Sequence, residues 1–308
     1  MLDISIIIPT YNRPEELQNC LASILEQTVL PDELIIVDDG NLEQIPLAGK
    51  LAKASIKVLY HKKDTPGLTA SRNVGIGLAT GGIIFFLDDD VVLYPHYTEK
   101  ILALFGDDPS HEIGGVGGLI ANTKPFNLKR KLFHHLERLF LLSGKIEGRV
   151  LPSGFCVDYG ETGNQIDEIV EVDFLPGGVS AYRKQVFESF SFSEDFIGYG
   201  QGEDKDFSFR VAQKYKLLIA PEAKLLHLES PKMRFDKFTK GQEYVLGRYK
   251  FFEDYLGSQG KSWFPFYYAI FGYLLKRLLI LLMSFDKSEF ARILGVLAAI
   301  KKMHQLPR

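Results

Sequence analysis

The sequence is poor in the features that mark several protein classes. Its 308 residues contain only two cysteines, Cys20 and Cys156, which are too few for a disulfide framework and lack metal-ligand spacing. We therefore expect a reducing compartment, with Cys20 as a buried thiol inside a helix. Lys and Arg number 36 against 39 Asp and Glu, so a net charge of -3 provides no bulk attraction for nucleic acid. We expect no nucleic-acid partner.

Other patterns are missing as well. No basic segment with a cleavable apolar stretch precedes the apolar run at residues 4–8, so no secretory signal is predicted. No Gly-x-Gly-x-x-Gly follows that run, which excludes a dinucleotide oxidoreductase. The chain has no internal repeat and no low-complexity linker, and its length suits one large domain or one and a half.

The first half of the chain alternates apolar runs with amphipathic segments. Strands are predicted at 4–8, 34–37, 56–60 and 83–87, and helices at 14–27, 43–53, 69–79 and 95–105. This order predicts an α/β fold, in which a mostly parallel sheet has helices on both faces and right-handed crossovers.

The second half is less regular. Strands are predicted at 116–120, 150–157, 168–175, 217–219 and 224–226, and helices at 126–142 and 203–215. The chain beyond Pro231 is helical and increasingly apolar. We therefore expect a domain over residues 1–230, with halves at 1–113 and 114–230, and a helical C-terminal extension over 231–308.

Three consecutive carboxylates, Asp88, Asp89 and Asp90, follow the apolar run at 83–87. Like charges repel, and burying one of them without a partner is costly. A divalent cation such as Mg²⁺ removes this cost, since hard cations take oxygen ligands and often keep substrate phosphates in their shell. The carboxyl ends of parallel strands are also where open α/β sheets bind ligands. The alternative is an acidic loop that caps the next helix.

Two further motifs follow predicted strands. The turn at residues 9–13 can offer backbone groups to a flat ring, or it is only a turn. Asp38 and Asp39 can accept hydrogen bonds from a base or from ribose hydroxyls, with Gly40 allowing a sharp turn. The alternative for both aspartates is helix capping.

Arg72 lies in the first turn of a helix led by Gly67, where helix N-termini and arginine favour phosphate. The alternative is a capped helix with a solvated arginine. A Pro-Gly-Gly loop containing Gly177 and Gly178 permits a close backbone approach under a ligand.

A Gly-rich loop at residues 198–202 delivers Glu203 and Asp204 to a helix N-terminus. Asp204 is our candidate general base for a hydroxyl, and a plain N-cap is the alternative. Asp206 and Arg210, four residues apart, read as a structural pair. His227 follows a predicted strand, and we consider it either a metal ligand or a structural histidine.

Together these motifs resemble the family 2 glycosyltransferases, from about Ile4 to His227. The motifs are Pro9-Thr10-Tyr11-Asn12-Arg13, Val37-Asp38-Asp39-Gly40, Gly67-Leu68-Thr69-Ala70-Ser71-Arg72-Asn73, Leu87-Asp88-Asp89-Asp90, the Pro-Gly-Gly loop and Glu203-Asp204 with Arg210. Each is modest alone, but their order and spacing are specific. Asn41 stands where many relatives carry Ser.

The resemblance implies a GT-A (Rossmann-like) fold and a hexosyltransferase-like enzyme that inverts the anomeric carbon of a nucleotide-diphosphate sugar, with a UDP-sugar favoured. It implies a divalent metal, Mn or Mg. The halves at 1–113 and 114–230 would serve nucleotide binding and the acceptor.

The resemblance also implies residue roles. Nucleotide binding falls to Pro9, Thr10, Tyr11, Arg13, Asp39, Arg72, Asp88 and Asp89. Asp88 and Asp90 match the outer acids of the family's Asp-x-Asp motif and would hold metal with His227. Asp204 matches the catalytic base, with Glu203 next in line, while Gly177 and Gly178 would line the sugar and acceptor loop.

The apolar tail motivates a prediction about location. Residues 263–285 could span a bilayer by length, but Lys276 and Arg277 near their middle favour a helix lying on the membrane surface. Attraction to anionic lipid would come from Arg292, Lys301, Lys302 and Arg308. We expect a cytoplasmic protein at the inner membrane face, with membrane contact through 263–303 and a glycan or lipid-linked acceptor of polysaccharide synthesis. The alternative is packing on the catalytic domain or on a second copy in a homo-oligomer.

Two other functions compete with this reading. A sugar-phosphate nucleotidyltransferase would carry a Gly-rich basic loop after the first strand, and residues 9–13 contain no glycine. A non-catalytic scaffold docked at a membrane would have lost its acids, yet all are present in the sequence: Asp39, Asp88, Asp90 and Asp204.

Overall fold

The computed structural model describes residues 2–195, 202–228, 236–303 and 305. The expected loop residues 198–201 and the tail residue Arg308 lie outside the described residues. The chain divides into two compact units, Met1–Thr123 with Ile166–Ser230, and Lys124–Gln165 with Pro231–Arg308. Each unit is described by itself.

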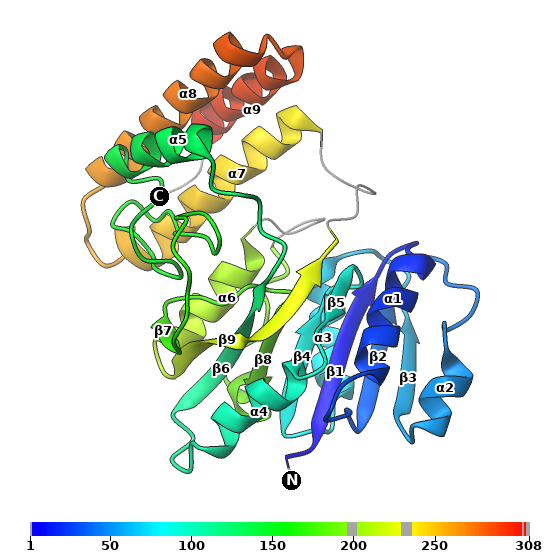
Figure 1. Ribbon diagram of the computed structural model, residues 1–308. Helices are drawn as coiled ribbons and strands as arrows, with labels where there is room; N and C mark the ends of the chain where they lie inside the picture. The colour runs from blue at the N-terminus through cyan, green and yellow to red at the C-terminus, as the bar shows by residue number, and fades with distance from the viewer. Residues whose placement is uncertain (1, 196–201, 229–235, 304, 306–308) are drawn as a thin grey trace. The chain divides into compact units, whose positions relative to one another are not determined.

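The first unit is built on one nine-stranded sheet, in the order β3-β2-β1-β4-β8-β6-β9-β5, with β7 paired to β9 (Figure 1). Four neighbouring strands are mutually parallel: β1 (Ile4–Thr10), β2 (Glu33–Asp38), β3 (Lys57–Lys62) and β4 (Ile83–Leu87). These are the strands predicted from the apolar runs of the first half.

The other half of the sheet is mixed. β8 (Val179–Arg183) runs antiparallel between β4 and β6 (Ile113–Ile120), and β6 is parallel to β9 (Lys216–His227). β5 (Val91–Leu93) and β7 (Val170–Val172) pair antiparallel with β9. The parallel arrangement that we predicted therefore holds for β1 to β4, whereas β8 reverses the chain direction beyond β4.

Several predicted strands differ from the structure. The two short strands at 217–219 and 224–226 are one strand, β9, because buried positions continue through Ala220 and Ala223. The strand predicted at 168–175 is reduced to β7, and 150–157 forms only the bridge between Val150 and Cys156. We did not predict β5 or β8, since neither gives a long apolar run.

Helices cover both faces of the sheet. Those of this unit are α1 (Pro14–Leu25), α2 (Ala48–Lys53), α3 (Leu68–Leu78), α4 (Tyr97–Gly106), the 3-10 helix η1 (Lys184–Glu188) and α6 (Glu203–Ala212). Ile6 and Ile8 share a core with Cys20 and Leu21 of α1, while a side chain at Gly75 of α3 would strike Ile7. Alternate β1 side chains therefore face α1 and α3. Cys20 is buried, as predicted.

The second unit is helical. Its helices are α5 (Leu128–Leu139), α7 (Lys237–Phe252), the π-helix η2 (Glu253–Gly257), α8 (Phe264–Ser284) and α9 (Lys287–Met303). Phe140 and Phe155 pack in one core with residues of α7, α8 and α9. Residues 124–165 therefore group with the C-terminal helices, which differs from the continuous domain that we predicted over 1–230.

Helix α8 is long and apolar enough to cross a membrane, with a mean hydropathy of 1.6 over its most apolar window, of which 28% is buried. Its two cations have partners within the unit. Lys276 pairs with Glu137 and Arg277 with Glu289. Both cations are therefore paired with acids of the same unit.

Candidate active site

The three consecutive aspartates divide between two environments. Asp89 is 3% exposed, and its carboxylate accepts hydrogen bonds from Thr10 Oγ1 at 2.8 Å and Arg13 Nη1 at 3.0 Å. Burial raises its pKa to about 6, with these hydrogen bonds opposing the rise. Both oxygens of Asp89 thus have protein partners. We interpret Asp89 as a residue that positions Thr10 and Arg13, whereas we had predicted a nucleotide contact.

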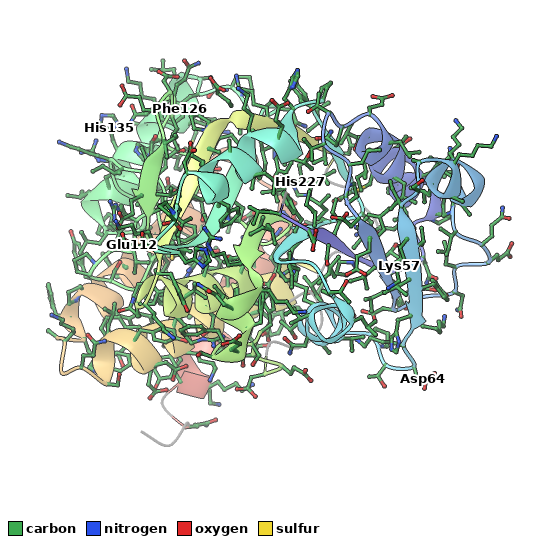
Figure 2. All side chains as sticks on the ribbon, turned by 90° about the horizontal axis from the view of Figure 1, so that it is seen from below. Lys57, Asp64, Glu112, Phe126, His135 and His227 are labelled. Carbon is green, nitrogen blue, oxygen red and sulfur yellow. The ribbon has the colours of Figure 1, made fainter. Side chains whose placement is uncertain are left out.

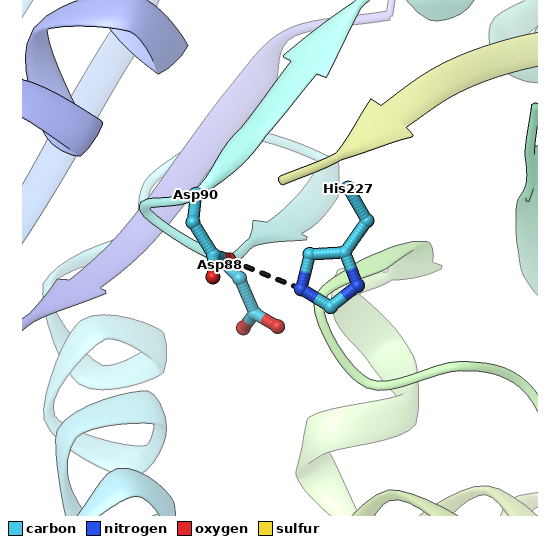
Figure 3. A group of neighbouring side chains, drawn as sticks. All are labelled: Asp88, Asp90 and His227. Carbon is cyan, nitrogen blue, oxygen red and sulfur yellow. Dashed lines mark ion pairs between the residues drawn. The ribbon is translucent and has the colours of Figure 1, made fainter. Parts of the chain in front are cut away.

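Asp88 and Asp90 converge instead with His227 (Figure 3). Each of the three offers one ligand atom, and these atoms lie within 4.8 Å of one another. His227 reaches this point because β9 pairs antiparallel with β5, which places Val91 opposite His227. His227 Nε2 lies 3.1 Å from Asp90 Oδ1. The three predicted metal ligands are therefore brought together.

This donor set fits a divalent cation. Two carboxylates are hard oxygen donors of the kind that Mg²⁺ and Mn²⁺ accept, and the imidazole is tolerated better by Mn²⁺. Three protein ligands leave coordination positions for water and phosphate oxygens.

The Pro-Gly-Gly loop contacts Asp88 directly. Asp88 donates its backbone N–H to the Gly178 carbonyl at 3.0 Å, one step beyond the last β4–β8 pair. A Cβ on Gly178 would lie 2.0 Å from Asp88 Cγ. A side chain at position 178 would therefore displace the Asp88 carboxylate. The approach of this loop to a ligand stays a prediction.

Arg72 connects Asp88 to the start of α6. Its side chain is almost fully buried, with Nη1 3.0 Å from Glu203 Oε1 and Nη2 3.4 Å from Asp88 Oδ1. Its guanidinium also lies over the Phe192 ring, 5.3 Å from the centroid. Burial lowers the pKa of Arg72, but the carboxylates of Glu203, Asp88 and Asp204 outweigh this effect and raise the pKa above its usual value. Arg72 is therefore a fixed cation inside the acidic site.

Glu203 and Asp204 differ in accessibility. Glu203 is buried, and burial together with the Asp204 charge raises its pKa to about 8, against the opposing effect of Arg72. Asp204 is half-buried, and its Oδ2 accepts from the Gly177 N–H at 3.2 Å. The N-cap of α6 is Gly202, so Asp204 is not a plain N-cap. Of the two acids, Asp204 is therefore the more accessible.

Asp39 joins the end of β2 to the start of α3. Its carboxylate accepts from the Gly67 N–H at 3.0 Å and from Ser71 Oγ at 2.8 Å, and it pairs with Lys63 Nζ at 3.0 Å. Lys63 was not predicted, and its only signal is a position directly after a strand. Asp38, by contrast, accepts from the N–H groups of Gly40 and Leu42 in the loop after β2. No helix begins at this loop, because α2 starts at Ala48, so Asp38 is not the helix cap that we had considered.

The turn after β1 lies beside the one after β2. Pro9 pairs with Val37 in the parallel ladder, and Tyr11 is half-buried beyond it. Asn12 Oδ1 accepts from the Asn41 N–H at 2.9 Å. These two predicted motifs therefore form one rim at the carboxyl ends of β1 and β2.

Asp206 and Arg210 are a structural pair, as predicted. Arg210 Nη2 lies 2.9 Å from Asp206 Oδ2, and it also donates to the Ser191 carbonyl at 2.7 Å. This pair holds α6 against the segment before it.

The chain is similar to several known proteins. Residues 5–189 match the family model described as Glycosyl transferase family 2. The chain belongs to this family. It is therefore a glycosyltransferase, and the resemblance drawn from its motifs is confirmed.

Curated relatives cover much of the chain. The uncharacterized glycosyltransferase YwdF of Bacillus subtilis is 29% identical, over 73% of this chain and 74% of its own length. The O-antigen chain rhamnosyltransferase RfbN of Salmonella typhimurium is 28% identical, over 77% and 70%. The chondroitin synthase of Escherichia coli is 26% identical over 74% of this chain, which spans only 35% of that enzyme.

A solved structure shares the fold. The mannosyltransferase PcManGT of Pyrobaculum calidifontis, in complex with GDP-Man and Mn²⁺, superposes with a TM-score of 0.56 at 14% identity. The match covers 98% of this chain and 90% of that one. The predicted GT-A fold, with its helical C-terminal extension, is confirmed.

Proposed function

We propose that this glycosyltransferase transfers a sugar from a nucleotide-diphosphate sugar to an acceptor hydroxyl, with inversion at the anomeric carbon. One observation carries the proposal: Arg72 bridges the metal-ligating Asp88 and the α6 start that bears Asp204. The groups needed by a leaving diphosphate and by an attacking hydroxyl thus belong to one hydrogen-bonded network.

Two positive charges would stabilise the leaving diphosphate in this network: a bound metal ion and Arg72. A divalent ion held by Asp88, Asp90 and His227 would supply Lewis-acid stabilisation for the departing diphosphate when bound. Arg72 lies beside the metal ligand Asp88, so its guanidinium would also stabilise the negative charge that develops on the diphosphate as the sugar leaves. Asp89 keeps Arg13 beside Asp90, since Arg13 Nη1 is 3.7 Å from Asp90 Oδ2.

The base in the proposal is Asp204. A single displacement needs one carboxylate on the face opposite the leaving group, unlike the pair used in glycoside hydrolysis. The Gly177 N–H orients one oxygen of Asp204. Glu203 is held by Arg72 and retains its proton more readily, so it is the weaker candidate.

The donor and the acceptor are each assigned to a part of the chain. We assign the nucleotide to residues 1–113, with Asp39 and Tyr11 at the β1–β2 rim beside the base and ribose. We assign acceptor binding to those residues of the predicted half at 114–230 that belong to the first unit, which are 114–123 and 166–230. We favour a UDP-sugar and a glycan or lipid-linked acceptor in a cytoplasmic setting at the membrane, with contact through 263–303. An O-antigen enzyme among the relatives supports a polysaccharide acceptor.

The test is calorimetric titration of the full chain with UDP, GDP and TDP, each with and without Mn²⁺. Metal-dependent binding of one nucleotide is expected. If nucleotide binds equally well with and without metal, the assignment of Asp88, Asp90 and His227 fails. Transfer from the matching sugar nucleotide, followed by NMR of the first-formed product, tests inversion. Retention of the anomeric configuration would contradict a single displacement.

A further inference from the structure

Helix α5 turns leucines outward. The exposed fractions of Leu128, Leu132 and Leu139 are 83%, 69% and 63%. Positions separated by four and eleven residues lie on one face of an α-helix, so these leucines form a single stripe. Surface helices of globular proteins normally direct such a stripe to the core.

The leucine stripe is not the face by which α5 packs on its own unit, because a different face of α5 makes those contacts. His134 is buried, Glu137 pairs with Lys276, and the following Phe140 lies against Tyr268 with ring centroids 5.1 Å apart. A side chain at Gly272 of α8 would strike Phe140. The helix is therefore anchored on α8 by one side and apolar on the other.

Positive charge borders the leucine stripe. The exposed Lys129 and Lys131 supply this charge, and the polar His135, labelled in Figure 2, is exposed beside them. The one carboxylate of α5, Glu137, belongs to the inner face. The outward face of α5 thus combines leucines with cations and carries no acid.

We propose that this outward face of α5 docks on the surface of an anionic lipid bilayer. Leucines inserted at the acyl boundary and lysines among the headgroups are the two contributions that bind an interfacial helix. A second copy of the chain is the poorer occupant, since an isologous contact would bring the same lysines face to face. The proposal concerns α5, outside the tail at 263–303, and is independent of the transfer reaction.

The experiment measures flotation of the full chain with vesicles of phosphatidylcholine alone and of phosphatidylcholine mixed equally with phosphatidylglycerol. One variant carries Leu128→Ser, Leu132→Ser and Leu139→Ser, and a second carries Lys129→Gln and Lys131→Gln. A matched control carries Leu30→Ser and Leu78→Ser, two leucines of the first unit with 36% exposure each. A comparison variant carries Leu294→Ser and Leu297→Ser on α9, inside the predicted tail region.

We expect the wild type to float with anionic vesicles, and the leucine variant to lose more than about tenfold in vesicle affinity. The lysine variant should lose about tenfold on anionic vesicles only, and added salt should have the same effect. The matched control should bind like the wild type. Because the changed leucines are exposed, thermal unfolding should not shift. If the triple variant does unfold, Leu132→Ser alone should still weaken binding about threefold.

Three results would overturn the proposal. In the first, the wild type binds neither kind of vesicle. In the second, the leucine variant binds as tightly as the wild type, whereas the α9 variant binds more weakly. In the third, light scattering shows that the wild type is a dimer and the leucine variant a monomer, which makes a second copy the occupant.

Discussion

Arg72 and Glu203, which are 131 residues apart in the sequence, form a buried hydrogen bond with an Nη1–Oε1 distance of 3.0 Å. Asp88 and Asp204 are also close to Arg72, and their negative charges favour its protonated form. One cation thus faces three carboxylates. Burial of Glu203 is the main cause of its raised pKa, and the neighbouring charge of Asp204 adds to it, while Arg72 opposes the rise.

Stability should therefore depend on the titration of Glu203. Its pKa rises from 4.5 to about 8, so between these values the folded state keeps a proton that the unfolded chain has released. The free energy of unfolding should fall as pH rises through this window and level off above about pH 8. In Glu203→Gln this contribution is absent.

Urea unfolding from about pH 5 to about pH 9 measures the difference between the wild type and Glu203→Gln. The wild type should lose stability relative to the variant as pH rises. The exposed Glu168→Gln is the control and should run parallel to the wild type. Parallel curves for Glu203→Gln as well would mean that Glu203 is ionised throughout.

Asp204→Asn should remove the general base while leaving the fold and the donor site intact. We expect kcat to fall about 10²–10⁴-fold, the usual contribution of a positioned base, with donor affinity unchanged. Steady-state kinetics and nucleotide calorimetry measure the two effects. Should Asp204→Asn stay active while Glu203→Gln is inactive, the base role moves to Glu203.

Asp89 and Asp90 should be separable by mutation, although they are neighbours. Asp90→Ala removes a metal ligand, so Mn²⁺ should no longer improve nucleotide binding. Asp89→Ala should keep the metal dependence but weaken nucleotide binding about 10–100-fold, because Thr10 and Arg13 lose their anchor. Calorimetry with and without Mn²⁺ distinguishes them. Equal loss of metal dependence in both variants would show that Asp89 acts on the metal directly.

Gly178→Ala should disturb the site through Asp88. Its Cβ would lie 2.0 Å from Asp88 Cγ, so the carboxylate must move, and the crowding should cost about 1–3 kcal/mol of stability. Metal-dependent nucleotide binding should fall with it. Gly77→Ala in α3 is the matched control, as nothing lies within 4 Å of its added Cβ, and it should be neutral or slightly stabilising. Wild-type metal binding by Gly178→Ala would show that Asp88 can swing away at no cost.

Local patterns predicted the parts of the fold that depend on local properties. The apolar runs at β1, β2 and β4 were found because both faces of a central parallel strand are buried, which leaves a continuous signal in the sequence. The edge strand β3 is partly exposed and gives a weaker signal. Strand-end acids were also found, since a charge directly after such a run stands out. The short strands β5 and β8 were missed because pairing with distant partners, and not their own residues, makes them strands.

The sequence by itself determined the family, the order of the strand-end motifs and the candidate acids, since these are properties of residue type and spacing. Only the tertiary structure decided how those acids are arranged and which of them are buried. The chain turns at Asp89, whose carboxylate binds Thr10 and Arg13, while the β5–β9 pairing brings His227 to Asp88 and Asp90. Burial then separates Glu203 from Asp204, although the two are adjacent in the chain. Exposure likewise shows that α5 presents leucines outward, because periodicity gives a helix its apolar stripe but not what covers it.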